Sequence, residues 1–164
     1  MREMTQVRDA VIQSLQKAGL QAVAAFPAER VKEYGGAVAT VDVGTVEGGA
    51  LGFCNYLGEM YDPERGTVRE LYGKVLEAEI LVEIRGSRAA LCQSGCETAA
   101  DVLLGGLPGG IRCGELTWEG LKWEKETELF LRRGKLGCQA VFVARSGEEG
   151  ETFLDFRLKG VMTT

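Results

Sequence analysis

The chain has 164 residues, a formal net charge of −5 and no histidine. Its hydrophobic fraction of 45% and charged fraction of 26% are ordinary for globular proteins and argue against a disordered chain. The acidic balance disfavours specific nucleic-acid binding, and the missing histidine removes the commonest general base and metal ligand. No apolar run approaches the roughly 20 residues that cross a bilayer, and the polar first residues do not resemble a secretory signal.

The first half of the chain predicts one helix followed by strands. Thr5 is a suitable N-cap, and Val7, Val11 and Leu15 recur at helical spacing up to Gly19, which predicts an amphipathic helix over residues 5–18. Short strands are expected over residues 20–26 and 37–43. Residues 47–66 are less regular, with Leu51, Phe53 and Tyr56 suggesting strand and residues 62–66 giving a turn signal.

The clearest strand lies over residues 76–85, where apolar side chains at 76, 78, 80, 82 and 84 face one way and the charged Glu77, Glu79, Glu83 and Arg85 face the other. One face of this strand should pack on a core, while the other meets water or a partner.

The second half predicts another helix and more strands. Ser87 is expected to cap a helix over residues 88–104, with Leu91, Ala99, Val102 and Leu103 buried and with Gly95 weakening it by roughly 1 kcal/mol. Four further strands are expected over residues 116–123, 124–131, 136–144 and 153–158, broken by Gly120, by Arg133-Gly134 and by residues 146–150. The order predicts a single α+β domain over residues 1–164, with two helices on one face of a mainly antiparallel sheet.

Five cysteines are an odd number, which favours free thiols in a reducing cytosol over a disulfide framework. Cys92 and Cys96 share one helix face, and a zinc site with Cys113 and Cys138 is conceivable. The second pair is scattered and no histidine completes the set, so packing in the core is the preferred interpretation. No cofactor or metal is predicted.

The glycine-rich segment over residues 105–114 invites a nucleotide-binding interpretation. A phosphate-binding loop follows a strand and opens a helix, whereas this segment follows a helix and precedes a strand. A loop that ends the helix is therefore expected.

Two acidic stripes are candidate sites. Their members are Glu77, Glu79 and Glu83 on one predicted strand, and Glu124, Glu126 and Glu128 on another. Such stripes are usually a solvated outer face, and the alternative is an acidic lining of a shared channel. The last predicted strand carries Asp155, Arg157 and Lys159. It either pairs with a neighbouring copy or is an ordinary edge strand whose charges discourage such pairing.

Taken together, the helix over Val7–Ala18, the strand over Val75–Arg85, the helix over Leu91–Leu104 and the segment Ile111–Trp118 resemble the small tail-terminator and tail-completion (head–tail joining) proteins of tailed bacteriophages and prophages. The resemblance implies a homo-oligomeric ring, commonly a hexamer, that caps the tail tube or joins it to the head. Tail-tube or neck proteins would be its partners, and it would lie in the bacterial cytoplasm or in the assembled tail. The lumen of a ring through which DNA passes should repel phosphate, so the glutamate stripes are candidates for that lining.

Two other interpretations remain open. One is a small ligand-binding or enzymatic domain with a pocket lined by Tyr56, Tyr61, Trp118 or Trp123, although aromatics on strands are more often core residues. The other is an adaptor that binds another chain through an edge strand. No catalytic residue is assigned, and the chain is not expected to be an enzyme.

Overall fold

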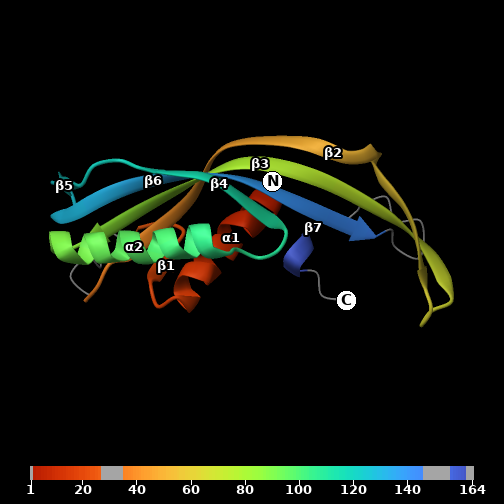
Figure 1. Ribbon diagram of the computed structural model, residues 1–164, viewed down its shortest axis with the longest axis horizontal. Helices are drawn as coiled ribbons and strands as arrows, with labels where there is room; N and C mark the ends of the chain where they lie inside the picture. Colours follow the sequence, from red (N-terminus) through yellow and green to blue (C-terminus); the bar gives the residue numbers. More distant parts are fainter. Residues whose placement is uncertain (1, 27–34, 146–155, 162–164) are drawn as a thin grey trace.

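The computed structural model describes residues 2–26, 35–145 and 156–161 (Figure 1). The elements follow in the order α1 (Arg2–Lys17), β1 (Gln21–Val23), β2 (Val38–Asp62), β3 (Thr67–Gly86), α2 (Ala89–Gly105), β4 (Ile111–Trp118), β5 (Lys122–Glu124), β6 (Leu129–Arg145), β7 (Arg157–Leu158) and the 3-10 turn η2 (Lys159–Val161). The α+β class and the mainly antiparallel sheet are confirmed.

One sheet contains all the described strands, in the order β1-β2-β3-β6-β4. Among the pairings of these described strands, only the short one between β1 and β2 is parallel. β6 pairs with β3 along one edge, and along its other edge it pairs in turn with β5, β4 and β7. None of the helices in the described part of the chain is long and apolar enough to cross a membrane.

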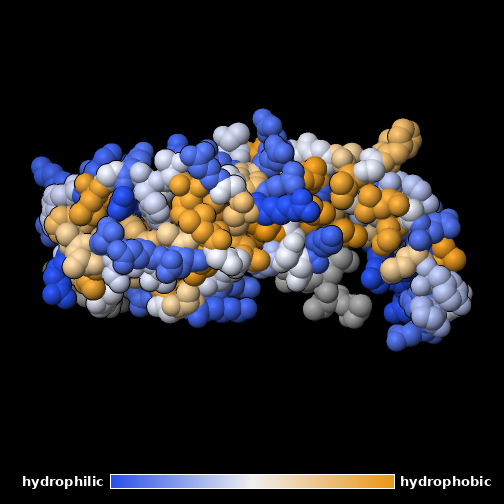
Figure 2. All heavy atoms as spheres, viewed as in Figure 1, coloured by the Kyte–Doolittle hydropathy of each residue, from blue (hydrophilic) through white to orange (hydrophobic). Residues whose placement is uncertain are grey.

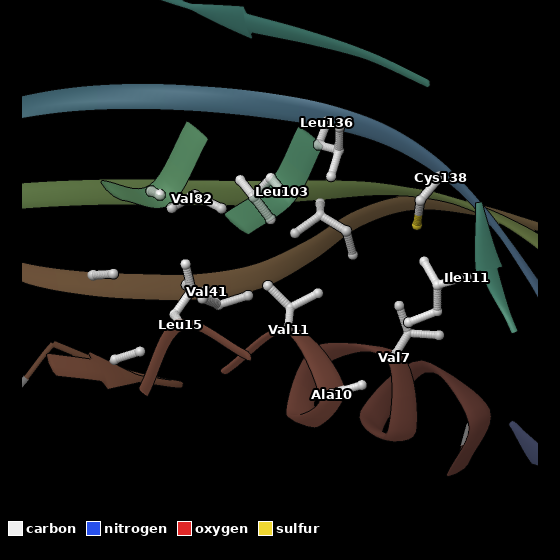
Figure 3. Close-up of a cluster of buried hydrophobic side chains, with 14 of the residues drawn as sticks. Val7, Ala10, Val11, Leu15, Val41, Val82, Leu103, Ile111, Leu136 and Cys138 are labelled. Atoms are coloured by element: carbon white, nitrogen blue, oxygen red, sulfur yellow. The ribbon is translucent and has the colours of Figure 1, made fainter. Parts of the chain in front are cut away.

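Both helices cover the same face of this sheet, and the hydrophobic core lies between them and β3 and β6 (Figures 1 and 3). The alternation of β3 buries Ile80, Val82 and Ile84 completely against the helices. α1 contributes fully buried residues at helical spacing, namely Val7, Val11 and Leu15. We call this side of the sheet the helix-side face and the other side the open face.

The helix boundaries differ from those expected. α1 begins at Arg2, so Thr5 lies inside it, and α2 has Arg88 as its N-cap with no hydrogen bond from a capping side chain. The predicted caps at Thr5 and Ser87 are therefore wrong, because the burial of each helix face outweighs the roughly 1 kcal/mol of a cap.

The buried face of α2 also differs in part. It consists of Cys92, Gly95, Cys96, Ala99 and Leu103. Ala99 and Leu103 were expected there, whereas Leu91 and Val102 are only half-buried.

β6 runs without a break through Arg133-Gly134, where the sequence predicts an interruption. Gly134 pairs with Trp118 of β4, and a Cβ atom at position 134 would lie 2.7 Å from two carbons of the indole ring. The glycine therefore provides space for a neighbouring ring and does not end the strand.

Gly95 has a similar role in α2. A Cβ atom there would lie 2.6 Å from the Cβ of Ala37 and 2.9 Å from the Cγ2 of Ile84. The glycine that lowers the intrinsic helix propensity thus allows α2 to approach the sheet closely.

Replacing Gly95 with alanine should therefore destabilise the protein, although alanine is the better helix former. We expect Gly95→Ala to lower the free energy of unfolding by about 1–3 kcal/mol, because neither neighbour is a flexible side-chain end. Urea unfolding followed by circular dichroism measures the change. Gly105→Ala is the matched control, since a Cβ there meets nothing within 4 Å, and it should leave the stability unchanged or slightly raised. Equal effects of the two substitutions would contradict this explanation.

Candidate interaction surfaces

The β2–β3 hairpin extends well past the helices and forms an arm (Figure 1). β3 has 20 residues and spans about 66 Å. The helices have 16 and 17 residues and span only about 24–26 Å. β6 accompanies β3 no further than the pairing of Leu71 with Arg145. We call residues 51–72 the arm, and apart from its base it is a two-stranded ribbon within the described residues.

The arm carries most of the exposed apolar surface that the structure describes. Six of nine exposed large hydrophobic side chains lie on it, namely Leu51, Phe53, Tyr56, Leu57, Tyr61 and Val68. Figure 2 shows this apolar surface over the arm, interrupted by hydrophilic residues. Exposed apolar surface concentrated in one place marks a site of interaction with another molecule.

A four-residue bulge interrupts the arm. Leu51 pairs with Gly73 and Tyr56 pairs with the adjacent Tyr72, so residues 52–55 have no partner on β3. The backbone is left-handed at Gly52, with φ of +82°, and also at Cys54 and Asn55. The bulge presents Phe53 to solvent with 85% of its surface exposed. Bulges of this kind change the direction in which a side chain points and make the strand edge irregular.

The helix-side face of the arm combines aromatic and acidic residues. Tyr56 and Tyr72 meet edge to face with ring centroids 5.7 Å apart. Next along the ribbon Glu59 lies directly opposite Glu70, followed by Tyr61 opposite Val68. The Tyr72 hydroxyl donates to Oε2 of Glu70 at 2.5 Å, and this hydrogen bond is the main cause that raises the pKa of Tyr72.

The open face of the sheet is acidic near its middle. Glu77, Glu79 and Glu83 lie on this face of β3, as the alternation predicts, because Ala78, Ile80 and Val82 between them are buried under the helices. Glu47 of β2 lies opposite Glu77. A shallow hollow of about 540 Å³ is lined by Glu47, Glu77, Glu79 and Arg112, among others.

The second predicted acidic stripe, Glu124, Glu126 and Glu128, does not form one face of a strand. β5 ends at Glu124 and β6 starts at Leu129, so residues 125–128 are a turn and not part of a strand over 124–131. Glu126 and Glu128 are exposed, and Glu128 has a left-handed φ of 56°. The expected alternation fails here because the chain reverses direction, and Glu124 points to a partner on β3 instead of to solvent.

That partner is Arg85, which lies on the open face and is only 8% exposed. Its Nε and Nη2 donate to the two carboxylate oxygens of Glu124 at 2.9 and 3.2 Å, and Nη2 also donates to Glu83 at 2.7 Å. Thr127 donates to Glu124 at 2.6 Å, and the Phe26 ring covers the guanidinium at 4.6 Å. This Arg85 cluster joins the β5–β6 turn to the centre of the sheet.

The hydrogen bond from Arg85 is the main cause that lowers the pKa of Glu124 below 4.5 in the folded protein. A depressed carboxyl pKa contributes stability above the unfolded pKa, and this contribution is lost as the pH falls through the folded value. We therefore expect the free energy of unfolding to decrease as the pH is lowered below about 4.5.

Glu124→Gln tests this contribution, because it removes one of the two carboxylates that hold Arg85 while Glu83 stays in place. At pH 7 it should cost about 1–3 kcal/mol, and the loss of stability in acid should become shallower. Urea unfolding between pH 3 and pH 7 measures both effects. Glu126→Gln, in the same turn but exposed, should change the stability by less than about 0.5 kcal/mol. An unchanged acid dependence in Glu124→Gln would show that other groups cause it.

The cysteines divide between the core and the arm. Cys92, Cys96 and Cys138 are buried in the core, as preferred from the sequence, whereas Cys54 is exposed on the bulge. Burial raises the pKa of Cys96 to about 12 and that of Cys138 to about 11, so both thiols are protonated at neutral pH. No group of three or more potential metal ligands occurs among the described residues.

The four aromatic residues considered for a pocket are not brought together. Tyr56 and Tyr61 lie on the arm, whereas Trp118 covers Gly134 and Trp123 packs edge to face on Phe130 at the opposite end of the sheet. The structure therefore does not bring these four residues into one pocket.

The C-terminal strand is held by its own chain. β7 pairs with β6, and the Gln6 side chain of α1 donates to the carbonyl of Phe156 and accepts from the amide of Leu158. Gln6 thereby occupies backbone groups that a neighbouring strand would use. Arg157 and Lys159 are exposed, and Asp155 lies outside the described residues.

Comparison with known proteins found no matching family model and no matching curated protein. Among solved structures, a chain of one titled "Virion of native gene transfer agent (GTA) particle" is similar at a TM-score of 0.36. Its sequence identity is 16%, and the alignment covers 84% of this chain and 94% of that chain. A likeness at this score does not establish a common fold or function.

Proposed function

We propose that this chain is a structural protein of a phage or prophage tail, a tail terminator or head–tail completion protein, that acts by self-assembly into a ring. The role needs no catalytic residue, cofactor or metal. The observation that carries the proposal is the arm, which leaves the body of the molecule and exposes apolar side chains on both of its faces.

An isolated two-stranded ribbon is marginally stable in water. The arm nevertheless has Leu51 and Leu57 over Gly73 on the open face and Tyr61 opposite Val68 on the helix-side face. A ribbon that is apolar on both faces gains stability when another molecule covers it. This favours a protein that works by assembly.

The acidic open face supports the ring in a second way. Glu47, Glu77 and Glu79 outnumber Arg112 on this surface, so its net charge is negative, which would repel phosphate and let DNA pass without binding. Of the residues suggested for a lumen, Glu77 and Glu79 fit this role best, because Glu83 and Glu124 are engaged by Arg85.

Self-assembly predicts a solution mass above that of one 17.7 kDa copy. Light scattering behind size exclusion, across a wide concentration range, should show a defined multiple of this mass. Phe53→Ser should shift the assembly to higher concentration, because it removes the most exposed apolar side chain of the arm. Leu104→Ser is the matched control, since Leu104 is 62% exposed at the end of α2, away from the arm. A single-copy mass at every concentration would contradict the proposed function.

Electron microscopy of the assembled particles tests the channel. We expect closed rings in which the open face of the sheet, with Glu47, Glu77 and Glu79, is directed toward the axis. Rings with the helices directed toward the axis would show that the acidic face does not line a channel.

A further inference from the structure

The end of the sheet opposite the arm carries a second exposed apolar patch. Leu121 is 42% exposed and Trp123 is 56% exposed. The patch lies where β5 pairs with the start of β6, and the Arg85 cluster fixes this turn to β3 through Glu124. We call Leu121, Trp123 and the flanking Lys122 and Lys125 the β5 end. With Leu104, the arm and the β5 end account for all the exposed large hydrophobic side chains of the described residues.

The two patches cannot meet within one copy. Glu59 of the arm pairs with Glu70, and Trp123 pairs with Phe130, which in turn pairs with Gly86. Sixteen residues of β3 separate Glu70 from Gly86, which corresponds to about 53 Å along the strand. Figure 1 shows the arm and β5 at opposite ends of the long axis.

Their charges have opposite signs. The arm has four carboxylates and two arginines, a net charge of −2, and its helix-side face places Glu59 directly opposite Glu70. Like charges in such a cross-strand pair are unfavourable, and a cation from a neighbouring copy would add to the interactions that Glu70 already makes within its own chain. At the β5 end Lys122 pairs with Glu119 at 3.8 Å. The remaining cations at and beside this end are Arg88, Lys125 and Arg132, and they outnumber the exposed carboxylates Glu126 and Glu128.

We propose that the arm of one copy docks on the β5 end of the next copy. Trp123 and Leu121 pack on the apolar side chains of the arm, and Lys122 and Lys125 approach Glu59 and Glu70. Because the contact joins two different surfaces, it is heterologous and repeats head to tail until the rotation closes a ring. This contact rests on the proposed self-assembly and assigns the surfaces that carry it.

Exchange of the charges tests the contact. The arm variant carries Glu59→Lys and Glu70→Lys, and the β5 variant carries Lys122→Glu and Lys125→Glu. Each alone should raise the midpoint concentration of assembly by about tenfold or more, measured by light scattering, because like charges then face each other. An equimolar mixture of the two variants should assemble into alternating multimers, because the normal arm then meets a normal β5 end and the lysine arm meets a glutamate β5 end. All four substitutions in one chain should restore assembly.

The control variant carries Glu97→Lys and Asp101→Lys on α2, which change the net charge as much as the arm variant does. It should assemble at the concentration of the unmodified chain. Circular dichroism melting confirms that each variant is folded, so that a loss of assembly is not a loss of structure.

The emission of Trp123 provides a readout that does not depend on charge. In a Trp118→Phe chain, the fluorescence of Trp123 should shift to shorter wavelength as the protein assembles, because the half-exposed indole becomes covered. A defined multimer whose assembly neither charge variant weakens, or whose Trp123 emission stays constant, overturns the head-to-tail contact and leaves the proposed function standing. An unmodified chain that stays monomeric overturns both.

Discussion

The dominant constraint in this protein is a mismatch of length between its strands and its helices. β3 packs Ile80, Val82 and Ile84 under α1 and α2, and this contact forms most of the core. A strand rises more than twice as far per residue as a helix does, so the 20 residues of β3 extend beyond the ends of the two helices. Within the described residues, the part of β3 before Leu71 pairs with β2 alone, and these two strands form the arm. The described part of the molecule therefore has a packed body and an extension without a core of its own.

The two ends of the sheet are stabilised in different ways. At one end the Arg85 cluster connects β3, β5 and the following turn through charged hydrogen bonds shielded by Phe26. At the other end the arm has cross-strand pairs and exposed apolar residues, and its bulge places Phe53 in solvent. A rigid end and a projecting end on one molecule suit a contact between successive copies. This asymmetry is the physical basis for the proposed head-to-tail assembly.

The fold was predicted from the sequence further than the candidate surfaces were. Hydrophobic periodicity located α1, α2 and the alternating part of β3, because burial of one face is a local pattern. The turn at residues 62–66 was also expected, and it is where β2 and β3 reverse. Leu51, Phe53 and Tyr56 suggested strand in this region, but the arm itself was not predicted, since residues 47–66 lack strict alternation. That these side chains are exposed on an extension of the sheet follows only from the tertiary structure.

The sequence by itself determined the α+β class, the core positions of α1 and β3, and the acidic stripe at Glu77 and Glu79, because each depends on spacing along one element. Only the tertiary structure decided the partners of individual residues. Whether Gly95 weakens a helix or allows close packing depends on Ala37 and Ile84, which are distant in the chain. Whether Glu124 lines a surface or pairs with Arg85 depends on where β5 turns back. Contacts between distant residues follow from strand register and element length, and neither is recorded in a local pattern.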